Sequence, residues 1–297
     1  MTYCPSIAMI AEECFTEYAL DFPVSQKTTY KIGGNADGAL FPDTANKATA
    51  VVKRLKEEGV PFVFLGNGSN VLISDEGFRG AVVCSERLKG ITVSGKMLTA
   101  LSGEPLSSVI KTALYSSLGG LEFLSGIPAS VGGAVSMNAG CYSKNVGDYV
   151  SYVVTTSGVL PQKDCGFDYR ESVFSVGDDM ILSVCFNLEN VEFEQSEAAI
   201  EKFLKLRAKK TPKGRSCGSV FKNDGYFAGK LIEQSGMKGV SVGGATVSEK
   251  HANFIIADKT AKSSDVYDLI RKIKDAVKRK TGAELKEELK FIGKFND

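Results

Sequence analysis

The sequence predicts a globular protein of mixed helix and strand content, of the α/β or the α+β class. Strand and helix patterns alternate between residues 39 and 65, strand patterns dominate residues 148–188, and helical patterns return after residue 197. Hydrophobic residues make up 43% and charged residues 24% of the 297 positions, which rules out a disordered or fibrous chain. This length suits one large domain or two to three modest ones.

The first 65 residues predict a poorly defined lead-in over residues 1–26, followed by strand, helix and strand in that order. Residues 8–18 have some helical character, and residues 39–41 and 61–65 are expected to form apolar strands. Between the two strands, Asp43 or Thr44 can cap a helix. The apolar face of that helix recurs at helical spacing, at Ala45, Ala48, Val52 and Leu55.

Further elements follow along the chain. A helix is expected from Pro105 to Leu118, because proline suits the first helical turn. Strands are expected at residues 152–156 and 180–184, and a last strand at residues 288–292. Three more helices are expected, at residues 197–209, 227–234 and 264–280.

Composition and charge exclude several classes of protein. Lys and Arg total 36 against 35 Asp and Glu, so nothing indicates a nucleic-acid partner. The N-terminus lacks the basic region of a signal peptide, and no apolar run approaches the length of a membrane span. Seven scattered cysteines and a single histidine, His251, argue against a disulfide framework, a metal site or a Ser-His-Asp triad. We therefore expect a cytoplasmic protein that binds neither a metal nor a membrane.

The segment Gly66-Asn67-Gly68-Ser69-Asn70 directly follows the expected strand at residues 61–65. Consecutive small residues let backbone N–H groups converge on an anion, and the Ser and Asn side chains add donors. The segment is neither a GxGxxG dinucleotide motif nor a phosphate-binding P-loop. Taken alone, it is more simply an ordinary turn between two strands.

A second glycine-rich segment, residues 126–142, contains four glycines and a proline with few charges. We interpret it as a backbone wrapped closely around a ligand, with Ile127 and Val131 against something flat. The alternative is a tightly packed structural turn. Two such segments in one chain favour a cofactor-binding site.

Three polar residues further along could carry chemistry. Arg170 beside Tyr169 could clamp a carboxylate through its planar guanidinium, although most arginines are simply solvated or ion-paired. Ser219 follows a glycine and, as a weak acid, could donate a proton only to a strongly basic centre such as a carbanion. Glu288 shares one side of its expected strand with Lys290. Its side chain either points inward or is a solvated charge at the edge of the sheet.

Taken together and in order, these motifs resemble the UDP-N-acetylenolpyruvoylglucosamine reductase family of flavoenzymes. The resemblance extends from Thr28 to Gly293. At 297 residues the chain is similar to the compact subgroup of that family. The segments that carry the resemblance are residues 29–34, 66–70, 126–142, 169–172, 218–223 and 288–293.

The resemblance implies an α+β fold with two subdomains that together bind FAD, of the vanillyl-alcohol-oxidase-like type, and a C-terminal α+β substrate domain. The implied domains are residues 1–88, 89–206 and 207–297, with the last strand, bearing Glu288, returning to the active site. FAD is expected to be noncovalent, since His251 lies in no flavin-attachment context. The implied FAD-binding residues are Gly66, Asn67, Gly68, Ser69, Asn70, Gly126, Ile127, Pro128, Ala129, Ser130, Gly132, Gly133 and Ala134.

The family reaction is the NADPH-dependent reduction of the enolpyruvyl ether of UDP-N-acetylglucosamine to UDP-N-acetylmuramate, for peptidoglycan synthesis. The resemblance implies that Arg170 and Glu288 flank the substrate carboxylate and that Ser219 protonates the carbon next to it. The residues implied to bind substrate are Tyr142, Tyr169, Lys222 and Asn223.

Three positions depart mildly from the family pattern: Lys31 replaces an arginine, Ala129 a glycine, and Asp224 a proline. Each is expected to adjust a loop rather than remove the chemistry. Two alternative functions stay open. One is another FAD oxidoreductase of the same fold, such as a hydroxy-acid oxidase, and the other is a noncatalytic flavin- or nucleotide-binding protein.

Overall fold

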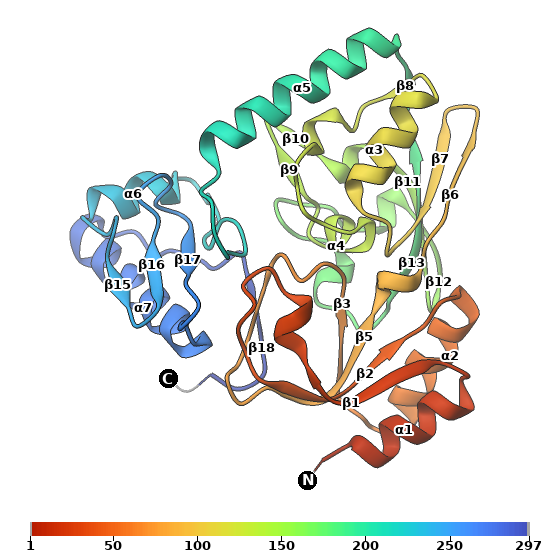
Figure 1. Cartoon of the computed structure of the whole chain (residues 1–297). Coiled ribbons are helices and arrows are strands. Elements are labelled where there is room, and N and C mark those ends of the chain that lie inside the picture. The colour runs from red at the N-terminus through yellow and green to blue at the C-terminus, as the bar shows by residue number, and fades with distance from the viewer. Residues whose placement is uncertain (1, 296–297) are drawn as a thin grey trace. The chain divides into compact units, whose positions relative to one another are not determined.

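The computed structural model describes residues 2–295, which contain seven α-helices and eighteen short strands (Figure 1). Contacts along the chain define two units. Unit 1 comprises Met1–Leu20, Asp37–Asn67 and Gly80–Arg207, and unit 2 comprises Asp21–Ala36, Gly68–Arg79 and Ala208–Asp297. The division at residues 88/89 and 206/207 that the sequence suggests stays a prediction.

The first sheet of unit 1 has four strands in the order β1-β2-β5-β3, with β3 and β5 parallel. These strands are β1 (Glu17–Pro23), β2 (Asn35–Phe41), β3 (Phe62–Leu65) and β5 (Phe78–Cys84). Two helices that contact each other, α1 (Cys4–Glu13) and α2 (Ala45–Glu57), share a hydrophobic core with this sheet. The predicted strand–helix–strand order is confirmed, and the Thr44 hydroxyl caps α2 by accepting a hydrogen bond from the Lys47 N–H at 3.3 Å.

The helical character expected around residues 8–18 belongs to a helix that lies earlier in the chain. Helix α1 begins at Cys4, with Pro5 in its first turn, and ends at Glu13. Phe15 has a positive φ of 50°, which a continuing helix cannot accommodate. The chain therefore turns there and enters strand β1 at Glu17.

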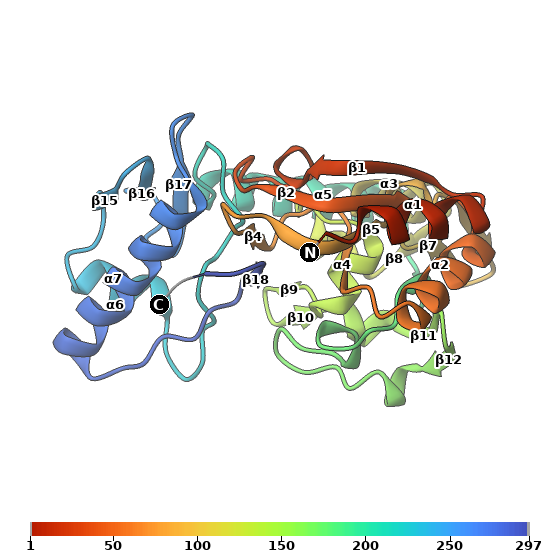
Figure 2. The ribbon, with the colours of Figure 1, turned by 90° about the horizontal axis from the view of Figure 1, so that it is seen from below.

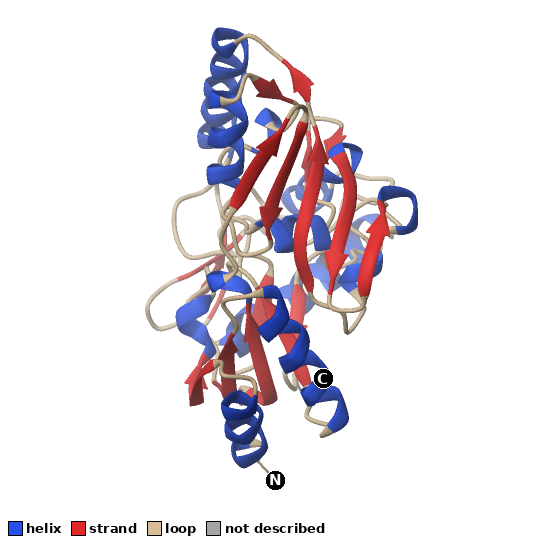
Figure 3. Cartoon of the chain, turned by 90° about the vertical axis from the view of Figure 1, so that its right-hand side faces the viewer, coloured by secondary structure: helices blue, strands red, loops and turns tan. Residues whose placement is uncertain are grey.

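The second sheet of unit 1 is antiparallel, with five strands in the order β12-β11-β13-β7-β6 (Figure 3). Helices α3 (Leu106–Tyr115) and α4 (Val131–Ser136) contribute to its hydrophobic core. Because antiparallel sheets and separate helices dominate, the α+β class is confirmed. The strands are β6 (Ile91–Ser94), β7 (Met97–Leu101), β11 (Val150–Thr155), β12 (Gly158–Pro161) and β13 (Ile181–Asn187).

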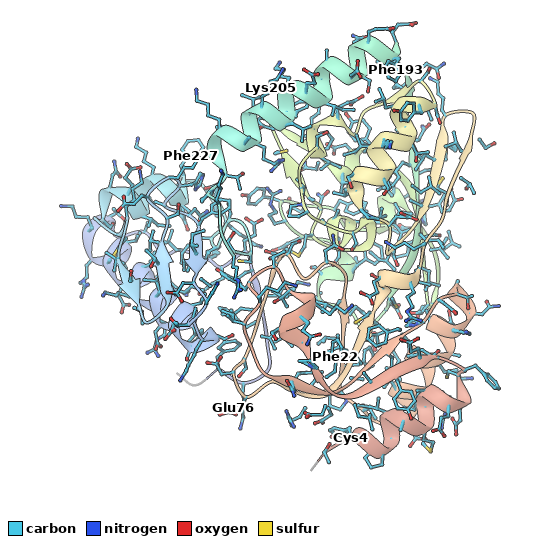
Figure 4. The ribbon with its side chains drawn as sticks, in the orientation of Figure 1. Cys4, Phe22, Glu76, Phe193, Lys205 and Phe227 are labelled. Carbon is cyan, nitrogen blue, oxygen red and sulfur yellow. The ribbon has the colours of Figure 1, made fainter. Side chains whose placement is uncertain are left out.

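The helix expected at residues 105–118 ends early, at Tyr115. Ser117 has a positive φ of 54°, which interrupts the helix. Leu118 belongs to a short strand, and its side chain is buried in the core. That strand, β8 (Leu118–Gly119), pairs with β14 (Glu189–Asn190), and β9 (Gly140–Cys141) pairs with β10 (Lys144–Asn145). The long helix α5 (Phe193–Lys210) follows, with Phe193 at its start and Lys205 near its end (Figure 4).

Unit 2 contains its own hydrophobic core around a small antiparallel sheet, β15-β16-β17, and the helices α6 and α7 (Figure 2). Here Gly282 ends α7 in the left-handed conformation, at φ 77°. A parallel pair joins β4 (Val71–Ile73) to β18 (Lys290–Ile292). The other bounds are α6 (Ala228–Gln234), α7 (Ser263–Thr281), β15 (Ser241–Val242), β16 (Ala245–Val247) and β17 (Ile255–Ala257).

None of the helices within residues 2–295 combines the length and the hydrophobicity that a membrane crossing requires.

Candidate functional site

The two glycine-rich segments of the sequence contact each other in unit 1. Gly66 directly follows strand β3, and a Cβ atom placed on it would overlap the Ser130 hydroxyl and lie 3.3 Å from Ser130 Cβ. Next to it, the Asn67 side-chain amide donates a hydrogen bond to the Pro128 carbonyl at 3.4 Å. Glycine at position 66 therefore permits a close approach of two segments some sixty residues apart.

The second segment is partly helical, because it contains helix α4. Ser130 caps α4, and its hydroxyl accepts a hydrogen bond from the Gly133 N–H at 3.3 Å. Val131 is fully buried in the core of unit 1, so the expectation that it packs against a flat ligand is wrong. Ile127 is half-buried, and Gly126 is exposed. Pro128 and Gly133 are exposed as well, so Gly126, Ile127, Pro128 and Gly133 are accessible to a ligand.

The glycines of α4 serve packing and internal hydrogen bonds. A Cβ atom on Gly132 would lie 2.9 Å from Ser102 Cβ. The N–H of Gly132 donates to the Ser102 carbonyl at 2.8 Å, and that of Ala134 to the Ser130 carbonyl at 2.9 Å. Any contact of Gly132, Gly133 and Ala134 with a cofactor, which stays a prediction, would therefore be by packing rather than through these N–H groups.

Hydrogen-bond donors without protein partners gather along both segments. Within residues 2–295, no protein group accepts a hydrogen bond from the backbone N–H of Asn67, Gly68, Ser69 or Asn70. The buried hydroxyls of Ser102 and Ser125, beside the second segment, likewise have no partner within the described chain. Because such groups normally find a partner, the consecutive main-chain N–H groups of residues 67–70 fit an anionic ligand.

Arg170 lies at the tip of a tight turn in unit 1. Asp168 and Glu171 exchange backbone hydrogen bonds of 3.1 and 3.2 Å, and Arg170 has a positive φ of 59°. One guanidinium nitrogen donates to the Gly140 carbonyl at 2.7 Å, and the group lies 5.1 Å from the centre of the Tyr169 ring. The guanidinium is therefore held in a fixed place, as a carboxylate clamp requires.

A buried asparagine forms a hydrogen bond to this turn. The Asn138 side-chain amide donates to the Asp168 carbonyl at 2.8 Å, while its oxygen accepts from the Gly147 N–H at 3.0 Å. Asn138 is 4% exposed, so these bonds are shielded from water. Asn138 lies within the glycine-rich segment 126–142, but the sequence did not indicate that its side chain forms hydrogen bonds to the Arg170 turn.

Tyr142 lies on the surface of unit 1 and is 40% exposed. Its ring packs against Phe203 of helix α5, with the ring centres 5.0 Å apart. The expected contact with the UDP part of a substrate stays a prediction.

In unit 2, the segment that carries Ser219 pairs with the segment that carries Glu288. The Glu288 N–H donates to the Val220 carbonyl at 2.7 Å, and the Lys222 N–H donates to the Lys286 carbonyl at 2.9 Å. These bonds place Phe221 opposite Glu287, so that Ser219 and Glu288 lie within one residue of each other across an antiparallel pair. The structure therefore brings the backbones of these two predicted catalytic residues close together, and their catalytic roles stay predictions.

Asn70 contacts the other side of the Glu288 segment. Its side-chain amide donates to the Glu288 carbonyl at 3.1 Å, and its own carbonyl accepts from the Lys290 N–H at 3.0 Å. The parallel pairing of β4 with β18 begins directly afterwards, with Val71 opposite Lys290 (Figure 2). The expected strand at 288–292 thus begins at Lys290, because Glu288 pairs with a different partner.

Burial near this pairing disfavours the charged forms of Cys217 and Lys290. Burial raises the pKa of the Cys217 thiol to about 12, and the charge of nearby Glu288 adds to the rise. Cys217, two residues before Ser219, therefore stays a thiol at neutral pH and is not a thiolate nucleophile. Burial also lowers the pKa of Lys290.

Two expected substrate-binding residues follow in unit 2. The Asn223 side-chain oxygen accepts a hydrogen bond from the Ala228 N–H at 2.9 Å, at the beginning of α6. Asn223 is exposed and Lys222 is half-buried. Asn223 therefore caps a helix, and the substrate contacts of both residues stay predictions.

Models of two protein families match the chain. The FAD binding domain matches residues 36–162, which include both glycine-rich segments. The C-terminal domain of UDP-N-acetylenolpyruvoylglucosamine reductase matches residues 209–292, which include Ser219 and Glu288. Together with the donors that fit an anionic ligand, these matches define a flavoprotein that uses FAD.

Relatives of the chain are similar over nearly its whole length. UDP-N-acetylenolpyruvoylglucosamine reductases of Caldanaerobacter subterraneus subsp. tengcongensis and Geobacillus kaustophilus are 39% and 41% identical; the alignments cover 92% of this chain in both cases, and 93% and 92% of the relatives. The crystal structure of the enzyme from Thermus caldophilus has a TM-score of 0.79 at 30% identity, covering 94% of this chain and 99% of that one. The chain belongs to the UDP-N-acetylenolpyruvoylglucosamine reductase family, and it is an FAD-dependent oxidoreductase.

Proposed function

We propose that the protein reduces the enolpyruvyl ether of UDP-N-acetylglucosamine to UDP-N-acetylmuramate with NADPH as the hydride donor, in peptidoglycan precursor synthesis. Membership of the family supports this reaction. The observation that carries it is the pairing of the Ser219 segment with the Glu288 segment in unit 2. An oxidase or a noncatalytic flavin-binding protein needs no proton donor next to a carboxylic acid.

The FAD pyrophosphate would be held by the N–H groups of residues 67–70, with the residues around Gly126 against the cofactor. Bound FAD supplies hydride, taken from NADPH, to the methylene carbon of the enolpyruvyl group. Noncovalent binding rests on the position of the single histidine, His251, outside both glycine-rich segments. Acid or heat should therefore release all the flavin from the yellow protein.

The residues then act on the charge that develops in the substrate. Arg170 would provide a fixed positive charge at the substrate carboxylate, where negative charge grows during the reaction. Ser219 would donate its proton to the carbon next to that carboxylate, which is basic enough to accept it. An ionised Glu288 would oppose this charge, so we assign it to act in its protonated form or to orient the arginine.

The residues proposed to bind the substrate are Tyr142, Tyr169, Lys222 and Asn223. We propose that the protein has neither a nucleic-acid nor a membrane partner. We place the enzyme in the cytoplasm. All seven cysteines are free thiols, which suits a reducing compartment.

The replacement Ser219→Ala tests this assignment. NADPH should bleach the flavin at close to the wild-type rate, because the proton donor has no part in that step. Reoxidation of the flavin by the UDP-enolpyruvyl sugar should slow by about a hundredfold or more. Stopped-flow absorbance of the flavin follows both half-reactions in one preparation.

Ser241→Ala is the matched control, since Ser241 is an exposed residue of unit 2 on strand β15. It should change neither half-reaction. Equal slowing of both half-reactions in Ser219→Ala would make Ser219 a structural or flavin-binding residue. A protein that is not oxidised by the UDP-enolpyruvyl sugar at all would contradict the proposed reaction.

A further inference from the structure

Asn253 forms three hydrogen bonds to the two residues that follow Ser219. Its side-chain oxygen accepts from the Phe221 N–H at 2.9 Å, and its side-chain amide donates to the Phe221 carbonyl at 2.8 Å. Its main-chain carbonyl accepts from the Val220 N–H at 2.9 Å. Asn253 is 2% exposed, so all three bonds are shielded from water.

These bonds complete the hydrogen bonding of a segment that has a strand partner on one side only. Glu288 donates to the Val220 carbonyl on that side, and Asn253 takes the place of a strand on the other. The side chains of Val220 and Phe221 are fully buried. The backbone immediately after Ser219 is therefore fixed by hydrogen bonds and by packing.

Before Ser219, Cys217 is buried in the core of unit 2, and Gly218 separates it from the serine. Gly218 has a positive φ of 85°, and a Cβ atom placed on it would have no neighbour within 4 Å. Because Gly218 itself has no close neighbour, the segment that follows Ser219 provides the directly adjoining restraint on its position. Asn253 is the side chain that contacts both polar groups of Phe221 in that segment.

Asn253 is itself held by a short turn that precedes strand β17. Its N–H donates to the ring nitrogen Nδ1 of His251 at 3.3 Å, and the Phe254 N–H donates to the His251 carbonyl at 3.0 Å. The turn fixes the direction of the Asn253 side chain toward Phe221. Its sequence, an asparagine inside a mostly apolar run, gave no indication of this contact.

We propose that Asn253 is a positioning residue that holds Ser219 so that the proton reaches one face of the substrate carbon. The inference rests on the proposed function, because it takes Ser219 as the proton donor. In that step, hydride adds to the methylene carbon and the π electron pair of the double bond moves to the neighbouring carbon. There a new C–H bond forms as the Ser219 O–H bond breaks, and the serine oxygen regains a proton from water.

The added proton creates a new stereocentre at that carbon. The ratio of the two product diastereomers can therefore be measured, and a loss of protein stability alone does not change this ratio. When Ser219 is held in place, one diastereomer forms. When it is displaced, water can deliver the proton from either face. A misplacement of about 1 Å can slow a catalysed step by about a hundredfold, so the rate of this half-reaction should fall as well.

The experiment uses the FAD-loaded full chain with Asn253→Asp and the milder Asn253→Ser. Aspartate keeps the shape of asparagine but places a carboxylate oxygen against the Phe221 carbonyl, whereas serine removes both side-chain bonds and keeps the bond from Val220. We expect bleaching by NADPH within about twofold of wild type, reoxidation by the UDP-enolpyruvyl sugar slowed about tenfold or more, and a second diastereomer in the product by NMR.

Asp75→Ala is the matched control, because Asp75 also forms hydrogen bonds inside unit 2 but does not contact the Ser219 segment. Its carboxylate accepts from the Ser263 and Ser264 N–H groups at 2.8 and 2.9 Å, at the beginning of α7. This variant should unfold at lower denaturant concentration and still give one diastereomer.

Two results separate the inference from the function on which it rests. A single diastereomer from both Asn253 variants, with the two half-reactions changed equally or not at all, would overturn the positioning role. Loss of folding in Asn253→Asp leaves Asn253→Ser to decide the matter by the same product analysis. If Ser219→Ala itself leaves reoxidation fast and the product pure, the assignment of the proton donor fails instead.

Discussion

The replacement Gly66→Ala tests whether the two glycine-rich segments pack as closely as the structure shows. The new methyl group would overlap the Ser130 hydroxyl and lie 3.3 Å from Ser130 Cβ. The backbone at Gly66 is not in the left-handed region, so the penalty is steric alone. Overpacking of this kind destabilises a protein by about 1–3 kcal/mol. A displacement of the segment that weakened FAD binding by about 1.4 kcal/mol would raise its dissociation constant about tenfold.

A double variant isolates the contact itself. Ser130→Ala removes the hydroxyl that meets the new methyl group and also removes the cap of α4, which alone costs about 1 kcal/mol. In Gly66→Ala/Ser130→Ala only the 3.3 Å approach to Ser130 Cβ remains. The double variant should therefore be less destabilised than the sum of the two single variants, by about 1 kcal/mol or more.

Urea unfolding of the four proteins measures the free energies, and quenching of flavin fluorescence measures FAD binding to the apoproteins. Gly229→Ala is the control, since a Cβ atom there has its nearest neighbour at 3.5 Å, in ordinary contact, inside helix α6. It should be neutral or stabilise the protein by up to about 1 kcal/mol. Strict additivity of the Gly66 and Ser130 effects would refute the close packing of the two segments.

Two further predictions concern Arg170 and His251. Arg170→Lys keeps the charge but loses the planar guanidinium that contacts the Gly140 carbonyl. Reoxidation of the flavin by substrate should slow by about a hundredfold while FAD still binds. Near-normal turnover would remove Arg170 from the catalytic residues. Burial lowers the pKa of His251 below 6.5, so its neutral form stabilises the fold above pH 6.5 and this contribution is lost as the pH falls through the lowered pKa. Because His251 is the single histidine, its ring proton resonance reports that pKa directly in a proton NMR titration, and a midpoint at or above 6.5 would contradict the burial.

The elements that the sequence predicted well are those whose signal is local. Helix α7 has one apolar face, charged residues elsewhere and a glycine at its end, so both its type and its end are confirmed. Helix α2 was predicted for the same reason, together with its cap at Thr44. Periodicity and capping residues act within one or two turns, and a single sequence shows them.

The elements that the sequence missed depend on partners far along the chain. Strand β18 was predicted, but its parallel pairing with β4, more than two hundred positions earlier in the chain, was not. Strand β1 was not predicted, because Glu17–Pro23 is extended through its place at the edge of the first sheet. Short strands carry little periodicity of their own, so their tertiary partners decide the conformation.

The candidate site divides in the same way. The types of residue that chemistry needs, such as Arg170, Ser219 and Glu288, stand out in a sequence because they lie beside glycines, aromatic residues or other charges. The residues that hold them, Asn138 and Asn253, do not stand out, since an asparagine acquires its meaning from the backbone groups that it contacts. Both are buried and both satisfy a donor and an acceptor of the chain.

Asn70 shows why a motif should not be assigned one role as a whole. The five residues from Gly66 to Asn70 look like one anion-binding loop, and the unpartnered N–H groups of residues 67–70 support that interpretation. Yet Gly66 is needed for its contact with Ser130, and the Asn70 side chain donates to the Glu288 carbonyl. A replacement of Asn70 would therefore disturb the segment that carries Glu288 as well as the loop proposed to bind the cofactor. A change in flavin affinity alone does not identify its role, and the two half-reactions must be measured separately.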